Sequence, residues 1–375
     1  MKAMISPDQT RLLRLKAQRL LHAGRSKTTP EHLIKDVFGV QAQELPAALL
    51  SVRARSKGLT ASSVEKARQT QGSIAWTWCM RGTLHLVSAE DARWLAPFLG
   101  PGMVTSGKRR LRQLGWEEDR LSTGIRLVEK ALSKQGELTR PEIVDLLKEN
   151  DLPSKGQAPV HLLFRMAAEG ILCRGPDKDG NHTFVLFEPW VGRLQPMPEE
   201  EALSKMAQRY LNAYAPARPE DLAAWSGLKA GEARKAWQLI ADQLVEVELT
   251  GLKGSEAQPA WLLKEQLAWL DERLDSEPVV RLLPRFDTYL LGYAKRDLAV
   301  EPAYAKRIQP GGGIIHQALI VNGQALGTWT STQKKDTLQV RVEPFKKLPP
   351  ELTPLIEAEV ADLGRFLGLE AELKT

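Results

Sequence analysis

Residues 141–187 read PEIVDLLKENDLPSKGQAPVHLLFRMAAEGILCRGPDKDGNHTFVLF, and this stretch decides the fold. Pro141 and Glu142 predict the start of a helix, because proline has no N–H to lose there and a carboxylate meets the positive end of the helix dipole. The amphipathic pattern of residues 156–169 predicts a second helix. Two apolar runs then flank Asp179-Gly180, a pair typical of a tight β-hairpin turn.

The same order recurs elsewhere in the chain. Pro30-Glu31 and Pro219-Glu220 also predict helix starts. After the latter, residues 229–243 form a second amphipathic helix, and residues 244–249 and 260–264 form strands around the turn 251–259. Helix, turn, helix and a two-stranded wing make up a winged helix-turn-helix unit. The copy at the N-terminus is longer, with its second helix at 41–55 and its extended part at 74–87.

The C-terminal part has a different pattern. Residues 279–283, 318–321 and 325–329 predict strands, and Asn322-Gly323 suits a type I′ hairpin turn. A helical pattern at 351–367 follows Pro349-Pro350, and Gly364 predicts an interruption in it. The predicted fold class is therefore α+β. The domains are winged helix-turn-helix units at 1–116, 117–195 and 196–270, then a small β-rich, barrel-like domain at 271–375 that ends in a helix.

Composition excludes several classes of protein. The chain has 375 residues, of which 43% are apolar and 26% charged, and this excludes collagen, pure disorder and a disulfide scaffold. Its two cysteines, Cys79 and Cys173, are not part of a CxxC pair, which indicates a reducing compartment and no zinc or redox site. Without an apolar signal segment or a run of 18 apolar residues, we expect a soluble cytoplasmic protein associated with the nucleoid.

The net charge of +6 hides an uneven distribution. Residues 1–116 carry 19 basic and 7 acidic side chains, whereas the other 259 residues carry 33 basic and 39 acidic ones. The basic residues form three clusters: Arg11, Arg14, Lys16 and Arg19; Arg53, Arg55 and Lys57; Lys108, Arg109, Arg110 and Arg112. Such clusters indicate a surface for a polyanion, most often nucleic acid. The alternative for each cluster is a solvated helix face.

Gln41-Ala42-Gln43 places two carboxamides close together at the predicted start of a helix in the basic third of the chain. Surface glutamines that only meet solvent are the alternative. A glutamine cannot act as a general base at neutral pH, but its amide donates and accepts hydrogen bonds together, so a pair can hold one water in a fixed orientation. Such a pair suits a reaction whose leaving group needs little assistance.

Residues 76–85 read WTWCMRGTLH and alternate with a period of two. If the run is extended, Arg81, Thr83 and His85 share one face, and the aromatic residues pack into the core on the other. Arginine can grip a phosphate through two hydrogen bonds, and Thr and His add neutral donors. We therefore expect Arg81, Thr83 and His85 to contact phosphates, with structural roles as the alternative.

Several other motifs are excluded. Gly311-Gly312-Gly313 has neither the Lys-Ser/Thr of a P-loop nor a GxGxxG context, so we expect a flexible loop. The sequence contains no HExxH motif, no zinc-deaminase pattern and no serine elbow. These absences favour a mechanism without a metal or cofactor.

Four blocks of the sequence resemble those of the AlkZ/YcaQ-type bacterial DNA glycosylases. They are QAQ at 41–43, RGTLH at 81–85, LPRFDTYLLGY at 283–293 and GTW at 327–329, in the same order as in the family. Some family members carry Asp at the second position of the first motif and others carry Gln. Gln43 places this chain with the AlkZ-like branch, which puts an aspartate mechanism in doubt.

The resemblance implies a fold of tandem winged helices and the excision of bulky N7-alkylated guanines, including the unhooking of interstrand crosslinks. It implies that Gln41 and Gln43 surround the nucleophilic water. The expected partner is double-stranded DNA that contains alkylated guanine, and the expected enzyme is a monomer that leaves an abasic site. DNA contacts are expected from residues of the basic clusters and of the second block: Arg53, Arg55, Lys57, Arg81, Thr83, His85, Lys108, Arg109, Arg110 and Arg112.

Two other functions remain open from the residues alone. A non-enzymatic DNA-binding protein or transcriptional regulator is indicated by the winged-helix order and the basic N-terminal third; such a protein must read base edges on undamaged DNA. An interaction module that uses the acidic remainder of the chain is the third possibility.

Overall fold

The computed structural model describes residues 3–22, 27–70, 72–250, 257–272 and 277–374, which form two compact units. Unit 1 contains Met1–Val64 and Leu203–Thr375, and unit 2 contains Glu65–Ala202. The boundaries pass through α4 (Ala61–Gln69) and α10 (Glu199–Tyr214). Residues 1–116 are thus divided between two units and do not form the single domain that we predicted.

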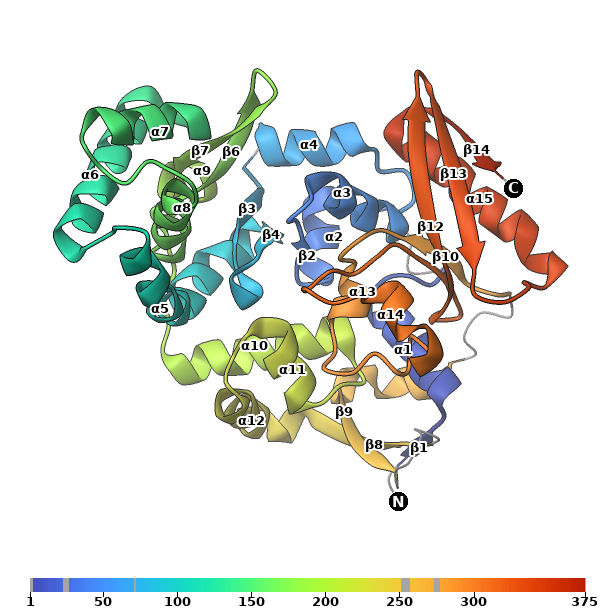
Figure 1. The fold of residues 1–375 in the computed structure, drawn as a ribbon. Helices are drawn as coiled ribbons and strands as arrows, with labels where there is room; N and C mark the ends of the chain where they lie inside the picture. The colour runs from blue at the N-terminus through green and yellow to red at the C-terminus, as the bar shows by residue number, and fades with distance from the viewer. Residues whose placement is uncertain (1–2, 23–26, 71, 251–256, 273–276, 375) are drawn as a thin grey trace. The chain divides into compact units, whose positions relative to one another are not determined.

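Unit 2 contains α+β elements in the predicted order (Figure 1). Its elements after α4 are β3 (Ile74–Trp78), a 3-10 turn (Met80–Gly82), β4 (Leu84–Ser88), α5 (Ala89–Gln113), α6 (Glu118–Gln135), β5 (Glu137–Thr139), α7 (Arg140–Glu149), α8 (Ala158–Ala168), β6 (Leu172–Lys178), β7 (Asn181–Leu186) and α9 (Phe187–Val191). The strands of this unit lie side by side in the order β4-β3-β6-β7-β5.

The starts and turns predicted in this stretch are confirmed. Thr139 caps α7 in a capping box with Glu142, and Pro141 lies in the first turn, where its missing N–H costs nothing. Asp179 and Gly180 join β6 to β7 with φ values of 50° and 74°. A type I′ turn requires positive φ at both central residues, and glycine meets this requirement without strain.

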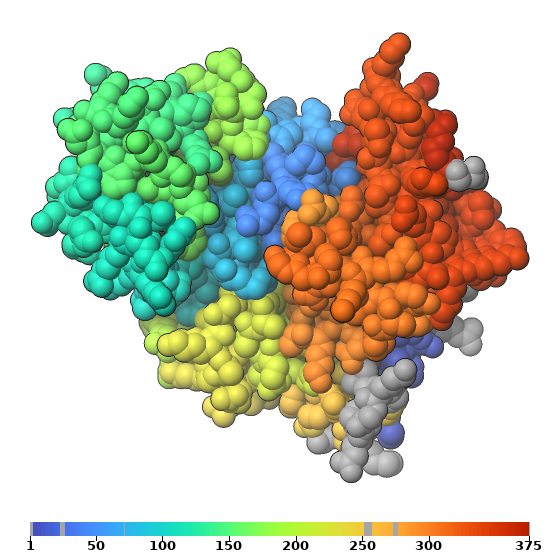
Figure 2. Space-filling model, viewed as in Figure 1, coloured from blue at the N-terminus to red at the C-terminus, as the bar shows by residue number. Residues whose placement is uncertain are grey.

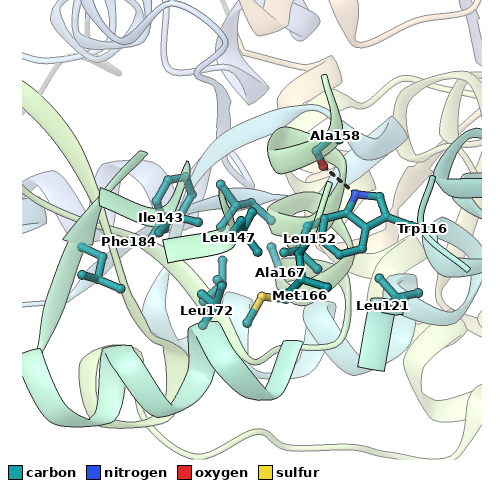
Figure 3. Packing of buried hydrophobic residues seen from close by; sticks show 14 of the residues in the cluster. Trp116, Leu121, Ile143, Leu147, Leu152, Ala158, Met166, Ala167, Leu172 and Phe184 are labelled. Carbon is teal, nitrogen blue, oxygen red and sulfur yellow. Dashed lines mark hydrogen bonds between the residues drawn. The ribbon is translucent and has the colours of Figure 1, made fainter. Parts of the chain in front are cut away.

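The core of unit 2 lies between the helices and the β5–β7 sheet (Figure 3). Trp116 lies at one side of this cluster, which contains buried side chains of α6, α7, α8, β6 and β7 (Figure 3). Its Nε1 donates to the carbonyl of Ala158 at 2.9 Å. Gly124 lies against the Trp116 ring, and a Cβ there would come within 2.8 Å of it. The burial of Trp116 thus joins the segment between α5 and α6 to the start of α8.

Unit 1 combines the N-terminal helices with the C-terminal half of the chain. Its elements besides α4 and α10 are β1 (Ala3–Ile5), α1 (Pro7–Ala17), α2 (Pro30–Asp36), β2 (Val40–Gln41), α3 (Leu45–Ala54), α11 (Pro219–Ser226), α12 (Ala230–Leu239), β8 (Leu244–Leu249), β9 (Gln258–Leu263), β10 (Val280–Leu283), α13 (Thr288–Leu291), α14 (Ala305–Ile308), β11 (Ala318–Val321), β12 (Gln324–Lys334), β13 (Thr337–Pro344), α15 (Thr353–Leu367) and β14 (Glu370–Lys374). The predicted helix starts at Pro30 and Pro219 are confirmed. Most of the predicted turn 251–259 lies outside the described residues, because its residues 251–256 are not among them.

The C-terminal sheet has the strand order β10-β11-β12-β13-β14, antiparallel except for the last pair, and it forms a curled β-rich layer (Figure 1). Alternate residues of a strand point to opposite faces, and both faces are buried here. Val280 and Leu282 pack with α15, whereas Leu283 and Ile320 pack with α1 residues such as Leu15. A sheet with both faces covered explains the continuous apolar runs at these strands.

Of two predictions for this part of the chain, one is confirmed and the other is wrong. Asn322 and Gly323 form the predicted β11–β12 turn, with φ values of 46° and 80°. In contrast, Gly364 does not interrupt α15, which is continuous from Thr353 to Leu367. A Cβ at Gly364 would meet the carbonyl of Leu369 at 2.6 Å, so this glycine allows close packing of the segment that follows α15. The β12–β13 hairpin is long, and its tip stands out from the sheet (Figure 2).

Candidate active site

The glutamine motif lies in unit 1, where β2 leads into α3. Gln41 is the last residue of β2 and is buried, Ala42 is fully buried, and Gln43 is exposed. The predicted helix over 41–55 is wrong at its start, because α3 begins at Leu45. Pro46 favours this start, because its ring and missing N–H disturb a helix interior but cost little in the first turn. The two amides therefore lie just before the helix, one buried and one in solvent.

A carboxylate and a guanidinium lie next to the motif. Glu44 is the N-cap residue of α3, where the positive end of the helix dipole favours a carboxylate. Its Oε1 lies 2.6 Å from Nη1 of Arg285, and both side chains are partly exposed. We did not single out Glu44 from the sequence. Its position directly after Gln43 was the available signal, and Arg285 belongs to the 283–293 block.

The far end of α3 is held by a buried ion pair. Arg55 and Asp287 are both fully buried, and two parallel hydrogen bonds of 2.8 and 2.7 Å join the guanidinium to the carboxylate. Asp287 also accepts from Ser51 Oγ at 2.8 Å, and Gln18 accepts from Arg55 at 3.0 Å. The segment that carries Arg285 and Asp287 therefore contacts α3 at both of its ends.

A second buried network holds the last turn of the helix. Arg53 Nη1 lies 3.0 Å from Glu359 and 3.2 Å from Asp362, both on α15, and Nη2 donates to the carbonyl of Leu282 at 2.7 Å. The predicted phosphate contacts of Arg53 and Arg55 are therefore wrong. Both guanidinium groups are enclosed and paired with carboxylates, so a phosphate cannot reach them. They anchor the helix that follows the glutamine motif.

The RGTLH block in unit 2 is a turn between two strands, not an extended run. Arg81 lies in the 3-10 turn with φ of 56°, and Gly82 donates to Cys79 O at 2.8 Å. The alternation of side chains breaks at this turn. The predicted common face of Arg81, Thr83 and His85 is therefore wrong, because only His85 lies on strand β4.

The side chains of this block serve different purposes. Thr83 Oγ1 donates to Met80 O at 3.1 Å, within the turn itself. His85 is buried, and this burial together with the charge of Arg81 lowers its pKa to about 3. The neutral ring places Nδ1 2.9 Å from Thr83 O. His85 therefore supports the turn and is not available to a phosphate, whereas Arg81 is half-buried.

Comparison with known proteins identifies the family of this chain. The family model for AlkZ-like DNA glycosylases matches residues 34–366 of this chain. The chain belongs to the AlkZ-like DNA glycosylase family. The matched residues include the glutamine motif, the RGTLH turn and the segment 283–293, which contacts α3. The predicted family is thus confirmed.

Two comparisons, one of sequence and one of structure, match Streptomyces sahachiroi and support the assignment to this glycosylase family. An interstrand DNA cross-link repair glycosylase is 27% identical over 369 residues, which cover 94% of each chain. The solved structure of the DNA glycosylase AlkZ matches with a TM-score of 0.82 and 25% identity and covers both chains completely. The α+β class predicted from the sequence is confirmed by this match.

In this glycosylase, the exposed basic residues lie on both units. Lys57 is exposed after the end of α3 in unit 1. Lys108, Arg109, Arg110 and Arg112 are all exposed on the last turns of α5 in unit 2, and Arg110 donates to Gln157 at 2.6 Å. No carboxylate pairs with these four side chains within the part of the chain that the structure describes. They remain candidates for phosphate contacts.

The first basic cluster, on α1, is different. Arg14 is buried, with its guanidinium 3.6 Å from the ring centre of Tyr293. Arg11 pairs with Asp8, Lys16 with Glu272 and Arg19 with Asp36. These charges are already compensated, which favours a structural role for this cluster.

Neither the cysteines nor the metal-binding types of side chain form a further site among the described residues. Both cysteines are buried, and burial raises the pKa of the Cys79 thiol to about 12 and that of Cys173 further. Among the described residues, no group of three His, Cys, Asp or Glu side chains could hold a metal ion. No described helix has both the length and the apolar character needed to cross a membrane.

Proposed function

We propose that this protein is a monofunctional DNA glycosylase that hydrolyses the N-glycosidic bond of N7-alkylated guanine in double-stranded DNA. Its substrates would include bulky adducts and interstrand crosslinks, like those implied by the name of the S. sahachiroi relative. The observation that carries the proposal is the pair Gln41 and Gln43 at the start of α3, one buried and one exposed. The anchoring of α3 by Arg53 and Arg55 supports a fixed geometry for this pair.

Hydrolysis of this glycosidic bond needs little catalytic assistance from the enzyme. Alkylation at N7 puts a positive charge on guanine, so the C1′–N9 bond breaks easily and its electron pair leaves with a neutral base. The sugar becomes oxocarbenium-like, a water oxygen bonds to C1′, and the displaced proton passes to solvent. Neutral amides can orient that water without taking its proton. The glutamine motif itself contains no lysine, which favours water over an amine nucleophile and thus an abasic product.

The scaffold that we propose for this activity includes winged helices. In unit 2, α6, β5, α7, α8, β6 and β7 follow one another in winged-helix order. In unit 1, α10, α11, α12, β8 and β9 do the same, with a β-bridge between Ala217 and Trp261. We infer that these are the units predicted at 117–195 and 196–270, and that the protein works as a monomer.

A direct assay tests the proposed activity. A duplex that contains one N7-methylguanine is incubated with the protein and then treated with alkali. We expect strand cleavage at the lesion after alkali and none before it, because a monofunctional enzyme leaves the backbone intact. If no N7-alkylated duplex releases its base, the protein is not this glycosylase. Sequence-selective binding to undamaged DNA would then favour a regulator.

The exposed cluster on α5 gives a prediction about binding. We expect the triple variant Lys108→Gln, Arg109→Gln and Arg112→Gln to bind undamaged duplex more weakly. The slope of log K against log salt concentration would shrink by about 0.9 for each phosphate that the variant no longer neutralises. Fluorescence anisotropy at several salt concentrations measures both quantities.

A matched triple controls for net charge. Lys130, Lys134 and Lys148 are exposed elsewhere in unit 2, and changing all three to Gln removes the same charge. We expect this control to change the slope much less. Equal slopes for the two triples would mean that the α5 cluster does not contact phosphates.

A further inference from the structure

Arg174 occupies an unusual place in the sheet of unit 2. It lies in the middle of β6, directly opposite Trp76 on β3 and Phe184 on β7. Side chains directly opposite each other on adjacent strands lie on the same face of a sheet. Trp76 and Phe184 are buried, whereas Arg174 is half-buried. A cation therefore interrupts a row of buried aromatic side chains.

The neighbours of Arg174 are rings, not carboxylates. Its guanidinium carbon lies 4.3 Å from the ring centre of Phe184, 5.3 Å from that of Trp76 and 5.9 Å from that of Trp78. Nε is buried without a hydrogen-bond partner, and no ion pair to Arg174 is found among the described residues. Rings attract a cation through their faces, but they satisfy none of its N–H donors.

Among the charges around Arg174, repulsion outweighs attraction. Burial, together with repulsion from Arg140 and Arg68, lowers the pKa of Arg174 to about 10, so it stays charged at neutral pH. Asp177 contributes an attractive charge, but it already lies 2.9 Å from Arg68 and 2.8 Å from His182. Arg68, in contrast, is paired with both Glu65 and Asp177.

An unpaired cation that is partly withdrawn from water raises the free energy of the folded protein unless an anion pairs with it. The rings hold the guanidinium plane in place, so little side-chain freedom is lost when an anion binds. Exposed Arg140, the first residue of α7, supplies a second positive charge nearby. Together they suit a phosphodiester, which accepts hydrogen bonds from such a fork.

We propose that Arg174, with Arg140 beside it, binds a backbone phosphate of the DNA substrate. This inference rests on the proposed function and adds a contact outside the three basic clusters of the sequence. Arg174 escapes a search for charge clusters because no other basic residue lies within three positions of it in the sequence. Only the packing of β3 and β7 against β6 shows that it lacks a partner.

Binding of undamaged duplex by Arg174→Met tests the proposal. Methionine keeps an apolar side chain between the rings but has no charge. We expect about 10-fold weaker binding, since a hydrogen-bonded charge contributes about 1.5 kcal/mol or more. The slope of log K against log salt concentration would fall by about 0.9. The melting temperature would stay the same or rise, because an uncompensated cation has been removed.

Arg165→Met is the matched control. Arg165 is in the same unit, but its Nη2 lies 2.7 Å from Glu169, so we expect its loss to leave the salt slope unchanged. Arg174→Lys keeps the charge without the planar fork and would retain part of the binding. If Arg174→Met binds with the wild-type affinity and slope, the proposal is wrong. The proposal would also be rejected if Arg174→Met both binds more weakly and melts at a lower temperature than the wild type, while Arg174→Lys retains none of the binding.

The assay separates this proposal from the proposed activity. Binding of undamaged duplex requires no excision, so a loss of binding in Arg174→Met supports the phosphate site even if the wild type releases no base. Conversely, normal excision by the wild type with unchanged binding in Arg174→Met would overturn the site alone.

Discussion

Replacing Gln41 and Gln43 with alanine is expected to abolish base excision while DNA binding survives. Both amides are proposed to orient the attacking water, and a small displacement of a reacting group can cost about 100-fold in rate. We therefore expect the single-turnover rate on N7-methylguanine DNA to fall by about 100-fold or more. Binding of the same duplex, measured by anisotropy, is expected to stay within a few-fold of the wild type.

Single variants sharpen this test. Gln43 is exposed, so Gln43→Ala opens no cavity in the core, and an unchanged melting temperature would show that a lower rate does not come from unfolding. Gln43→Asn keeps the amide but shortens the side chain by one methylene, and we expect most of the activity to be lost with it. Gln135→Ala removes an exposed amide at the end of α6 and serves as the control. Excision by Gln43→Ala at the wild-type rate would rule out the proposed role of this amide.

Removing Asp287 is expected to produce the largest loss of stability. Asp287→Ala leaves Arg55 buried, charged and without its carboxylate, and breaking one side of a buried pair costs about 3–5 kcal/mol. Ser51 and the backbone N–H of Tyr289 lose an acceptor as well. We expect a markedly lower urea midpoint, measured by far-UV circular dichroism.

Asp8→Ala is the matched control for burial. Asp8 also pairs with an arginine, Arg11, but its side chain is 82% exposed, and such surface pairs contribute only about 0–1 kcal/mol. Adding Arg55→Met to Asp287→Ala removes the uncompensated charge and is expected to restore part of the stability. Equal midpoints for Asp8→Ala and Asp287→Ala would contradict a stabilising role for the buried pair.

Local features of the fold were predictable because their causes lie within a few residues. Pro30, Pro141 and Pro219 lie at or next to the first residue of a helix, where proline is favoured because it has no N–H to lose. The turns at Asp179-Gly180 and Asn322-Gly323 follow from the positive φ that these pairs accept. The helix predicted from Gln41 begins at Leu45 instead, which places Pro46 in the first turn, where proline costs least.

The candidate site could be predicted only in part. The sequence pointed to Gln41 and Gln43 and to a family of DNA glycosylases, and the family model confirms the latter. It did not point to Glu44, because a single carboxylate beside a motif is an ordinary surface residue until Arg285 is found 2.6 Å away. The predicted common face of the RGTLH block was wrong, because the alternation of side chains does not reveal the turn at Arg81.

The residues alone were enough for the family, the α+β class, the helix starts at Pro30, Pro141 and Pro219, and the two hairpin turns. Only the tertiary structure decided which basic residues are free to meet an anion. Arg55 and Lys57 are two positions apart in one basic cluster, yet Arg55 is enclosed with Asp287 and Lys57 is exposed. The physical reason is that a charge is compensated by whatever the fold brings near it. For Arg55, that carboxylate comes from 232 residues further along the chain.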